Sequence, residues 1–129
     1  MSNKPEDLRY TKEHEWLKLD GESAYIGITE YAAEQLGDVV HVELPQPNDE
    51  FNKDEAFGVV ESVKSVSDMY MPVSAKVIQS NESLLENAGI INEEPYNEGW
   101  IVKILITEPT ELEDLMTHDQ YKEFINDEL

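Results

Sequence analysis

The stretch Val59-Val60-Glu61-Ser62-Val63-Lys64-Ser65-Val66-Ser67-Asp68-Met69-Tyr70-Met71-Pro72 decides the fold of this chain. Lys64 lies between two apolar runs, and residues 56–63 and 66–71 are predicted to be strands. Val63 and Val66 can pair across Lys64-Ser65, which places Lys64 at the tip of a hairpin. The turn contains neither Gly nor Asn, so local turn chemistry alone does not predict it.

Working outward from this hairpin, apolar runs predict further strands near residues 16–19, 24–28, 39–44, 75–79 and 100–106. Thr29 is expected to cap a short helix that Gly37 ends. Apolar residues recur at helical spacing near the C-terminus, at Tyr121, Phe124 and Ile125. Many short strands followed by a terminal helix predict a mainly β fold, a sandwich or barrel with helices on its outside. We expect residues 1–129 to form a single domain.

The composition excludes several classes of function. The 129 residues include 9 Lys and Arg against 29 Asp and Glu, a formal net charge of −20. Such a chain repels phosphate backbones and anionic lipids, so we expect neither nucleic acid nor membrane as a partner. The absence of cysteine excludes disulfides, thiolate catalysis and cysteine-bound metals. No apolar stretch approaches the length of a membrane span, and the N-terminus resembles no signal or transit peptide, so we expect a cytoplasmic protein.

No catalytic constellation is recognisable in the sequence. His14, His41 and His118 are far apart and share no ligand spacing, and no Gly-rich phosphate loop or nucleophile elbow occurs. We therefore expect no catalytic residue and no metal site. Any chemistry in which this protein takes part is expected to be carried out by a group attached to it.

Lys64 is the only basic residue between positions 54 and 75. The simplest interpretation is an ordinary surface lysine. The alternative is a modification site, because a lysine at an exposed, rigid tip is accessible to a modifying enzyme. A long acyl arm attached there would carry its reactive end roughly 14 Å from the backbone, by bond-length arithmetic.

The segment from Glu61 to Asp68, followed by Tyr70 to Ser74, closely resembles the lipoyl-attachment segment of the glycine cleavage system H protein family. Other stretches resemble further motifs of that family in the same order: 10–16, 26–29, 36–45, 92–96 and 99–101. The resemblance therefore covers almost the whole chain.

This resemblance implies a barrel-sandwich hybrid fold of the lipoyl- and biotinyl-carrier type and a carrier that is not an enzyme. Lys64 matches the lysine that carries lipoate covalently. The implied partners are a pyridoxal-phosphate-dependent glycine decarboxylase, a tetrahydrofolate-dependent aminomethyltransferase, a flavin-dependent dihydrolipoyl dehydrogenase and lipoylating enzymes. The carrier would shuttle the aminomethyl group of glycine between them, and we expect it to be a monomer.

The resemblance also implies roles for three acidic residues. Glu61 matches the acid three positions before the lysine, a recognition feature for the lipoylating enzyme. Glu15 and Asp68 match positions that hold the loaded amine in a surface cleft, and a protonated amine does favour carboxylates in a partly dry cleft. The alternative for Glu15 is a charge on a strand surface, and for Asp68 an acceptor beside a turn.

Two positions depart from the family pattern. Ala75 stands where Gly is usual, and a positive φ there would cost on the order of 1 kcal/mol. His41 stands where an aromatic residue is common, and we expect it to be a half-buried strand residue.

Other carriers fit the sequence less well. Biotin carriers typically flank their lysine with methionines, whereas the neighbours here are Val63 and Ser65. Lipoyl modules of 2-oxoacid dehydrogenases are shorter and belong to larger chains. Two alternatives remain open from sequence: a protein that donates lipoyl groups to other complexes, and an unmodified interaction domain.

Overall fold

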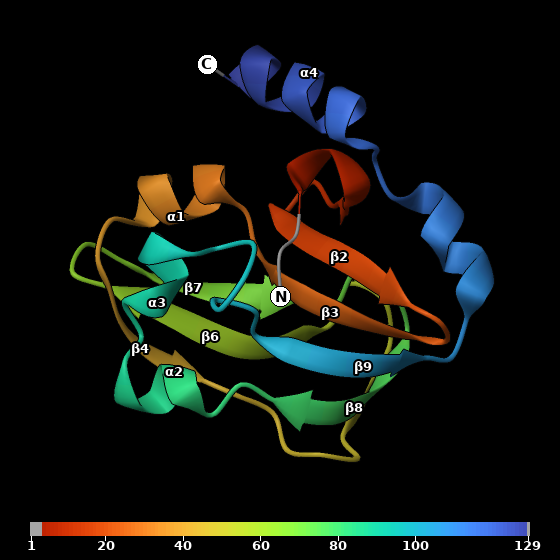
Figure 1. Cartoon of the computed structure of the whole chain (residues 1–129), viewed down its shortest axis with the longest axis horizontal. Coiled ribbons are helices and arrows are strands. Elements are labelled where there is room, and N and C mark those ends of the chain that lie inside the picture. Colours follow the sequence, from red (N-terminus) through yellow and green to blue (C-terminus); the bar gives the residue numbers. More distant parts are fainter. Residues whose placement is uncertain (1–3, 129) are drawn as a thin grey trace.

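The computed structural model describes residues 4–128. Its strands form two antiparallel sheets (Figure 1). The six-stranded sheet has the order β1 (Arg9–Tyr10), β2 (Glu15–Asp20), β3 (Ser23–Ile28), β9 (Val102–Ile106), β8 (Ala75–Ser80) and β5 (Glu50–Phe51). The three-stranded sheet has the order β4 (Val39–Glu43), β6 (Ala56–Ser62) and β7 (Val66–Tyr70).

Short helices surround the two sheets. They are η1 (Pro5–Asp7), α1 (Glu30–Leu36), α2 (Ser83–Glu86), α3 (Ile90–Glu93), η2 (Pro109–Asp114) and the C-terminal α4 (His118–Glu128). As expected, Thr29 caps α1 by accepting a hydrogen bond from the Ala32 amide, and Gly37 ends the helix with a φ of 80°. The predicted mainly β fold with short peripheral helices and a helical C-terminus is confirmed. No helix within residues 4–128 is long and apolar enough to cross a membrane.

The main core lies between the facing sheets. The six-stranded sheet contributes buried side chains such as Ile26 and Ile104, and the three-stranded sheet contributes Val42, Val60 and Met69. Alternate residues of a strand face opposite sides, so each sheet buries one face. Each of these side chains contributes about 1.5–3 kcal/mol by leaving water. The three-stranded sheet that carries the β6–β7 hairpin is therefore held firmly against its partner.

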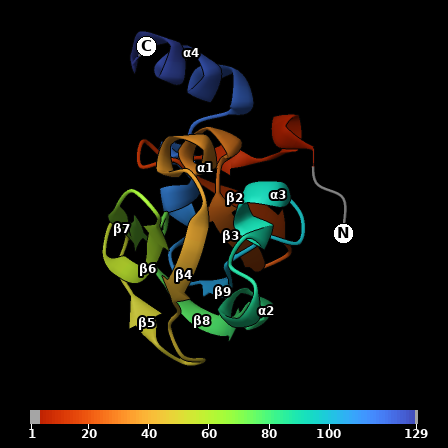
Figure 2. The same ribbon diagram turned by 90° about the vertical axis from the view of Figure 1, so that its left-hand side faces the viewer.

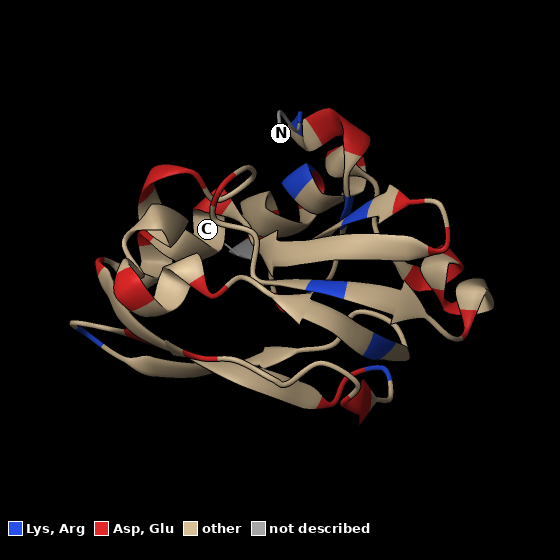
Figure 3. Ribbon diagram, turned by 60° about the horizontal axis from the view of Figure 1, so that its bottom comes forward, with Lys and Arg blue, Asp and Glu red and all other residues tan. Residues whose placement is uncertain are grey.

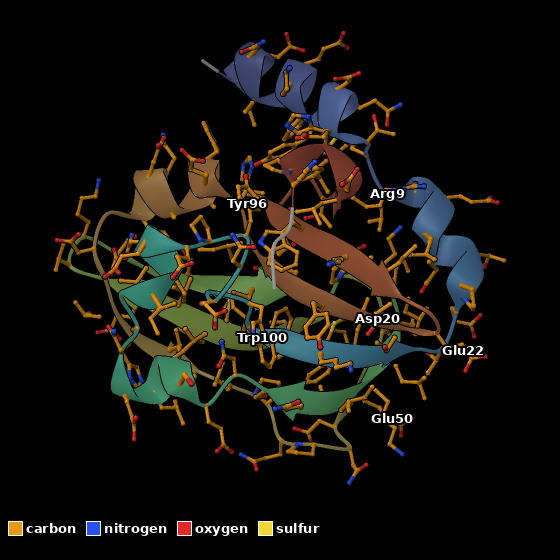
Figure 4. The ribbon with its side chains drawn as sticks, in the orientation of Figure 1. Arg9, Asp20, Glu22, Glu50, Tyr96 and Trp100 are labelled. Atoms are coloured by element: carbon orange, nitrogen blue, oxygen red, sulfur yellow. The ribbon has the colours of Figure 1, made fainter. Side chains whose placement is uncertain are left out.

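A second, aromatic cluster attaches α4 to the outside of the six-stranded sheet. Tyr121 of α4 stacks on Tyr10 with ring centroids 4.6 Å apart, and Trp16 is fully buried beside them. Tyr96 and Trp100, labelled in Figure 4, pack against this cluster. The Tyr121 hydroxyl also lies 2.8 Å from the Thr29 hydroxyl, which ties α4 to the start of α1.

The structure shows the surroundings of Ala75 and His41, the two positions that depart from the family pattern. Ala75 is buried at the start of β8 and is not among the residues with positive φ, so the expected strain does not arise. The prediction that His41 is half buried was wrong, because its side chain is exposed. A register irregularity in β4 between Val39 and His41 leaves Val40 and His41 both exposed.

Candidate functional site

Lys64 lies at the apex of the β6–β7 hairpin, at one end of the molecule (Figure 1). Glu61 pairs with Val66, and the Ser62 amide donates a hydrogen bond to the Ser65 carbonyl at 2.8 Å. The predicted pairing of Val63 with Val66 was therefore wrong. The turn is centred on Val63-Lys64 instead of Lys64-Ser65, and Lys64 is exposed at its tip in either register.

The side chain of Ser62 explains how this turn closes without Gly or Asn. Its hydroxyl oxygen accepts hydrogen bonds from the amides of Lys64 and Ser65, both at 3.1 Å, and donates to the Ser65 carbonyl at 3.4 Å. The hydroxyl thus takes over the acceptor role that a backbone carbonyl has in most tight turns. Sequence reasoning missed Ser62, although a serine two residues before an exposed apex is a known turn-forming pattern.

The tip is also tied to the neighbouring segment between α1 and β4. The Val63 amide donates a hydrogen bond to the Asp38 carbonyl at 3.0 Å. The Lys64 side chain lies against Gly37, where a Cβ added to the glycine would come within 3.1 Å of Lys64 Cε. Figure 2 views this end of the molecule, with the β6–β7 hairpin beside β4 and α1 above them. The position of Lys64 is therefore fixed relative to α1.

A surface hollow of about 630 Å³ lies between α1 and the hairpin. Glu15 and Asp68 both line it, together with Tyr31 of α1 and Val66 at the end of the turn. The structure thus brings two of the three predicted acids together, on the side of the hairpin that faces α1. Glu61 does not line this hollow and lies on β6 between His41 and Val66 in the strand register.

Glu15 is almost completely buried, so its interpretation as a strand-surface charge is wrong. One carboxyl oxygen accepts a hydrogen bond from the Thr11 hydroxyl at 2.6 Å, and the other accepts from the Tyr70 amide at 3.2 Å. Burial raises the pKa of Glu15 to about 8, against the opposing effect of these two hydrogen bonds. The carboxyl group is therefore mostly protonated at neutral pH, and a cation entering the hollow would favour loss of its proton.

The described residues contain no group of three or more His, Asp or Glu side chains arranged to hold a metal ion. Two other lysines form ion pairs: Lys53 with Asp114 at 2.9 Å, and Lys103 with Asp20 at 3.9 Å. Lys64 has no such pair in the part of the chain that the structure describes. Its amine is available for modification without the loss of an ion pair.

Comparison with known proteins identifies the family. The family model described as glycine cleavage H-protein matches residues 8–128. The chain belongs to the glycine cleavage H-protein family. A glycine cleavage system H protein of Halothermothrix orenii is 52% identical over 97% of this chain and 98% of its own length. Those of Staphylococcus haemolyticus and Halalkalibacterium halodurans are 51% and 48% identical over 95% and 99% of this chain, and over 98% and 100% of their own lengths.

The fold comparison agrees with the family. A crystal structure of a glycine cleavage system H protein from Mycobacterium marinum matches with a TM-score of 0.82 and 33% identity, covering 91% of this chain and 94% of that one. The expected lipoyl-carrier fold is thereby confirmed. The chain is a non-catalytic carrier of the glycine cleavage system, and its cofactor is a lipoate bound covalently to a lysine. It works with the enzymes of that system.

The residues at the hairpin tip fit a lipoyl group. Lipoate forms an amide with a lysine amine, which requires an exposed side chain, and Lys64 meets that requirement. The hollow beside the hairpin provides partly apolar lining from Ile28, Leu36 and Val60, together with the two carboxyl groups. Its chemistry suits an arm with an apolar stem and a cationic end.

Proposed function

We propose that Lys64 carries the lipoate of this chain. The observation that carries the proposal is the exposure of Lys64 at the apex of a turn that Ser62 closes with its own hydroxyl. A side chain presented in this way has a fixed origin and a free end. An arm of roughly 14 Å on it can enter the active sites of several enzymes while the β-sheets remain folded.

The partners proposed are a pyridoxal-phosphate-dependent glycine decarboxylase, a tetrahydrofolate-dependent aminomethyltransferase and a flavin-dependent dihydrolipoyl dehydrogenase. When bound, lipoate supplies a disulfide that accepts electrons and the aminomethyl group. The chain's own contribution is to hold the arm by the Lys64 amide nitrogen and to present it in a fixed direction. Lipoylating enzymes would attach the arm, and we propose that Glu61, next to the turn on β6, is one of the residues they recognise.

We further propose that the loaded arm rests in the hollow lined by Glu15 and Asp68. A protonated amine there would meet the buried carboxyl of Glu15 and the exposed carboxylate of Asp68. Because the pKa of Glu15 is about 8, the approach of the cation would release a proton from Glu15, which then holds the amine as an ion pair. Residence in the hollow would shield the amine from water between enzymes.

The protein is proposed to act as a monomer formed by one domain over residues 1–129. A monomer exposes the hairpin tip to each partner in turn. Sedimentation equilibrium of the purified protein checks the oligomeric state. The cytoplasmic location remains a prediction, to be checked by fractionation of cells that express the protein.

Intact mass spectrometry tests the attachment site. Wild-type protein, Lys64→Arg and Lys122→Arg are expressed in cells supplied with lipoate, since Lys122 is an exposed lysine of α4 remote from the turn in sequence. We expect a lipoyl mass on wild type and Lys122→Arg and none on Lys64→Arg. A lipoyl mass that persists on Lys64→Arg contradicts the site. A biotinyl mass, or none, on wild type in the presence of a competent lipoylating enzyme contradicts the proposed function itself.

A further inference from the structure

Exposed apolar side chains gather at the hairpin tip. Among the described residues, four large apolar side chains are more than half exposed: Val40 at 55%, Val63 at 67%, Val66 at 64% and Leu85 at 60%. The first three belong to the turn or to the strand bonded to it, and they form what we call the valine collar of Lys64. Elsewhere, Asp and Glu residues are spread along the chain and outnumber Lys and Arg by 29 to 9, as the red and blue segments of Figure 3 show.

The strand register explains why these valines lie together. Val63 directly precedes Lys64 in the turn, and Val66 begins β7 two residues after it. Val40 occupies the irregularity in β4 opposite Glu61 and Ser62, so that it is exposed instead of entering the core. The hydrogen bond from the Val63 amide to the Asp38 carbonyl holds the turn against the segment that leads into that strand. The collar therefore combines two chain segments around one lysine.

The collar is also preformed. The Ser62 hydroxyl and the Asp38 carbonyl fix the backbone of the turn, and valine has few side-chain rotamers. Contact with a partner would thus cost little conformational entropy. Exposed valines lower solubility and add nothing to the core, so their concentration at this point indicates a surface that is covered during function.

We propose that the valine collar is the docking surface for the enzyme that attaches lipoate to Lys64. This proposal rests on the proposed function, because it takes Lys64 as the attachment site. The partner surface would be an apolar rim around an entrance just wide enough for a lysine side chain. Glu61, adjacent to Val66 in the strand register, would supply a polar contact at the edge of that rim.

The length of the Lys64 side chain before and after lipoylation distinguishes this partner from the enzymes of the glycine cleavage system. An unmodified lysine places its amine only about 6 Å from its Cα, by bond-length arithmetic, whereas the lipoylated side chain extends roughly 14 Å. The attaching enzyme must therefore bring its active site against the turn itself and cover Val63, Val66 and Val40. An enzyme that acts on the far end of the arm can stay farther away and need not touch the collar.

The test uses substitutions that remove apolar surface while keeping shape. Val40→Thr, Val63→Thr and the double variant are compared with wild type and with Ile78→Thr, an exposed β-branched residue of β8 in the other sheet. The rate of lipoyl mass gain with purified lipoate–protein ligase, lipoate and ATP is followed by mass spectrometry, and peptide mapping locates the modification. We expect kcat/KM to fall roughly threefold for each single variant and about tenfold for the double, with Ile78→Thr unchanged.

A second measurement separates docking from damage to the turn. The double variant is lipoylated to completion by long incubation, reduced, and reoxidised by dihydrolipoyl dehydrogenase with NAD. We expect a rate within about twofold of wild type, because this enzyme meets the far end of the arm. Lipoylation of the double variant at the wild-type rate overturns the proposal, and so does a reoxidation rate that falls as much as lipoylation does. If wild type gains no lipoyl mass at Lys64, the proposed function fails instead.

Discussion

The two hairpins β2–β3 and β6–β7 lie at opposite ends of the molecule and close their turns by different means (Figure 1). The β2–β3 turn connects Asp20 to Ser23 and relies on Gly21, whose φ is 66°. The β6–β7 turn contains no residue with positive φ and is closed by the Ser62 hydroxyl. Figure 4 labels Asp20 and Glu22, which mark the first turn.

The difference shows what a turn needs in order to hold an exposed lysine in a fixed position. A turn with glycine at positive φ depends on local backbone freedom, so it needs no contact from a neighbouring segment. The β6–β7 turn depends on a side chain and on the Asp38 carbonyl of a neighbouring segment. Such a turn is fixed relative to α1 and to the hollow. A lysine that carries an arm to a defined place needs a turn of this kind.

Glu15 joins the two hairpins, and its titration should give the largest effect on stability. It begins β2, yet one of its carboxyl oxygens accepts from the Tyr70 amide at the end of β7. Its pKa of about 8 in the folded protein lies above the ordinary value of 4.5, so the folded state keeps a proton that the unfolded state loses between these values. The stabilisation is complete below about pH 4.5 and disappears as pH rises through 8.

We therefore expect Glu15→Gln, which mimics the neutral acid, to flatten the pH dependence of stability. The wild-type free energy of unfolding should fall relative to the variant by at most about 1.4 kcal/mol per pH unit within this window. Urea unfolding at about pH 5 and about pH 9 measures it, with the variant relatively more stable at the higher pH. Parallel curves for the two proteins would show that Glu15 ionises normally.

Ser62→Ala tests whether the Ser62 hydroxyl orders the β6–β7 turn for lipoylation. Loss of the hydroxyl leaves the amides of Lys64 and Ser65 without their acceptor, at a cost of about 1 kcal/mol since both can reach water. The turn becomes less ordered, and we expect lipoylation to slow by about tenfold, because the ligase must then order the turn itself. Thermal unfolding and the rate of mass gain measure the two effects.

Ser62→Thr is the control for this prediction, since its hydroxyl can accept the same two hydrogen bonds. It should recover most of the lipoylation rate. Lipoylation of Ser62→Ala at the wild-type rate would mean that the order of the turn is irrelevant to the ligase.

The sequence predicted the β2–β3 hairpin better than the β6–β7 hairpin, because sequence patterns indicate local structure and miss the contacts of single side chains. The apolar runs near residues 16–19 and 24–28 are local signals, so β2 and β3 were predictable. The register of β6–β7 was predicted one residue out at the turn, because the Ser62 hydroxyl replaces a backbone acceptor. The burial of Glu15 could not be inferred, since its hydrogen bond to the Tyr70 amide joins residues 55 positions apart.

Gly21→Ala should lower stability without slowing lipoylation, whereas Ser62→Ala should do both. An added Cβ meets no atom within 4 Å, so the only cost is backbone strain at positive φ, about 1 kcal/mol. We expect a lower midpoint of thermal unfolding and an unchanged rate of lipoylation. A slower lipoylation of Gly21→Ala would show that the two ends of the molecule are coupled, and would remove the distinction between the hairpins.

Electrostatic steering should give the smallest effect and distinguish the two ends once more. With a net charge of −20, the carrier is expected to meet its enzymes faster at low salt, and screening shortens the range from about 10 Å at 0.1 M to about 3 Å at 1 M. Only charges near the docking surface steer effectively. Asp38→Asn, beside the Lys64 turn, should therefore lower kcat/KM for lipoylation by the ligase about twofold at low salt. Glu22→Gln, at the β2–β3 turn, should change it less. The rate of lipoyl mass gain across a salt series measures the effect. Rates independent of salt would show that the acidic surface does not steer the encounter.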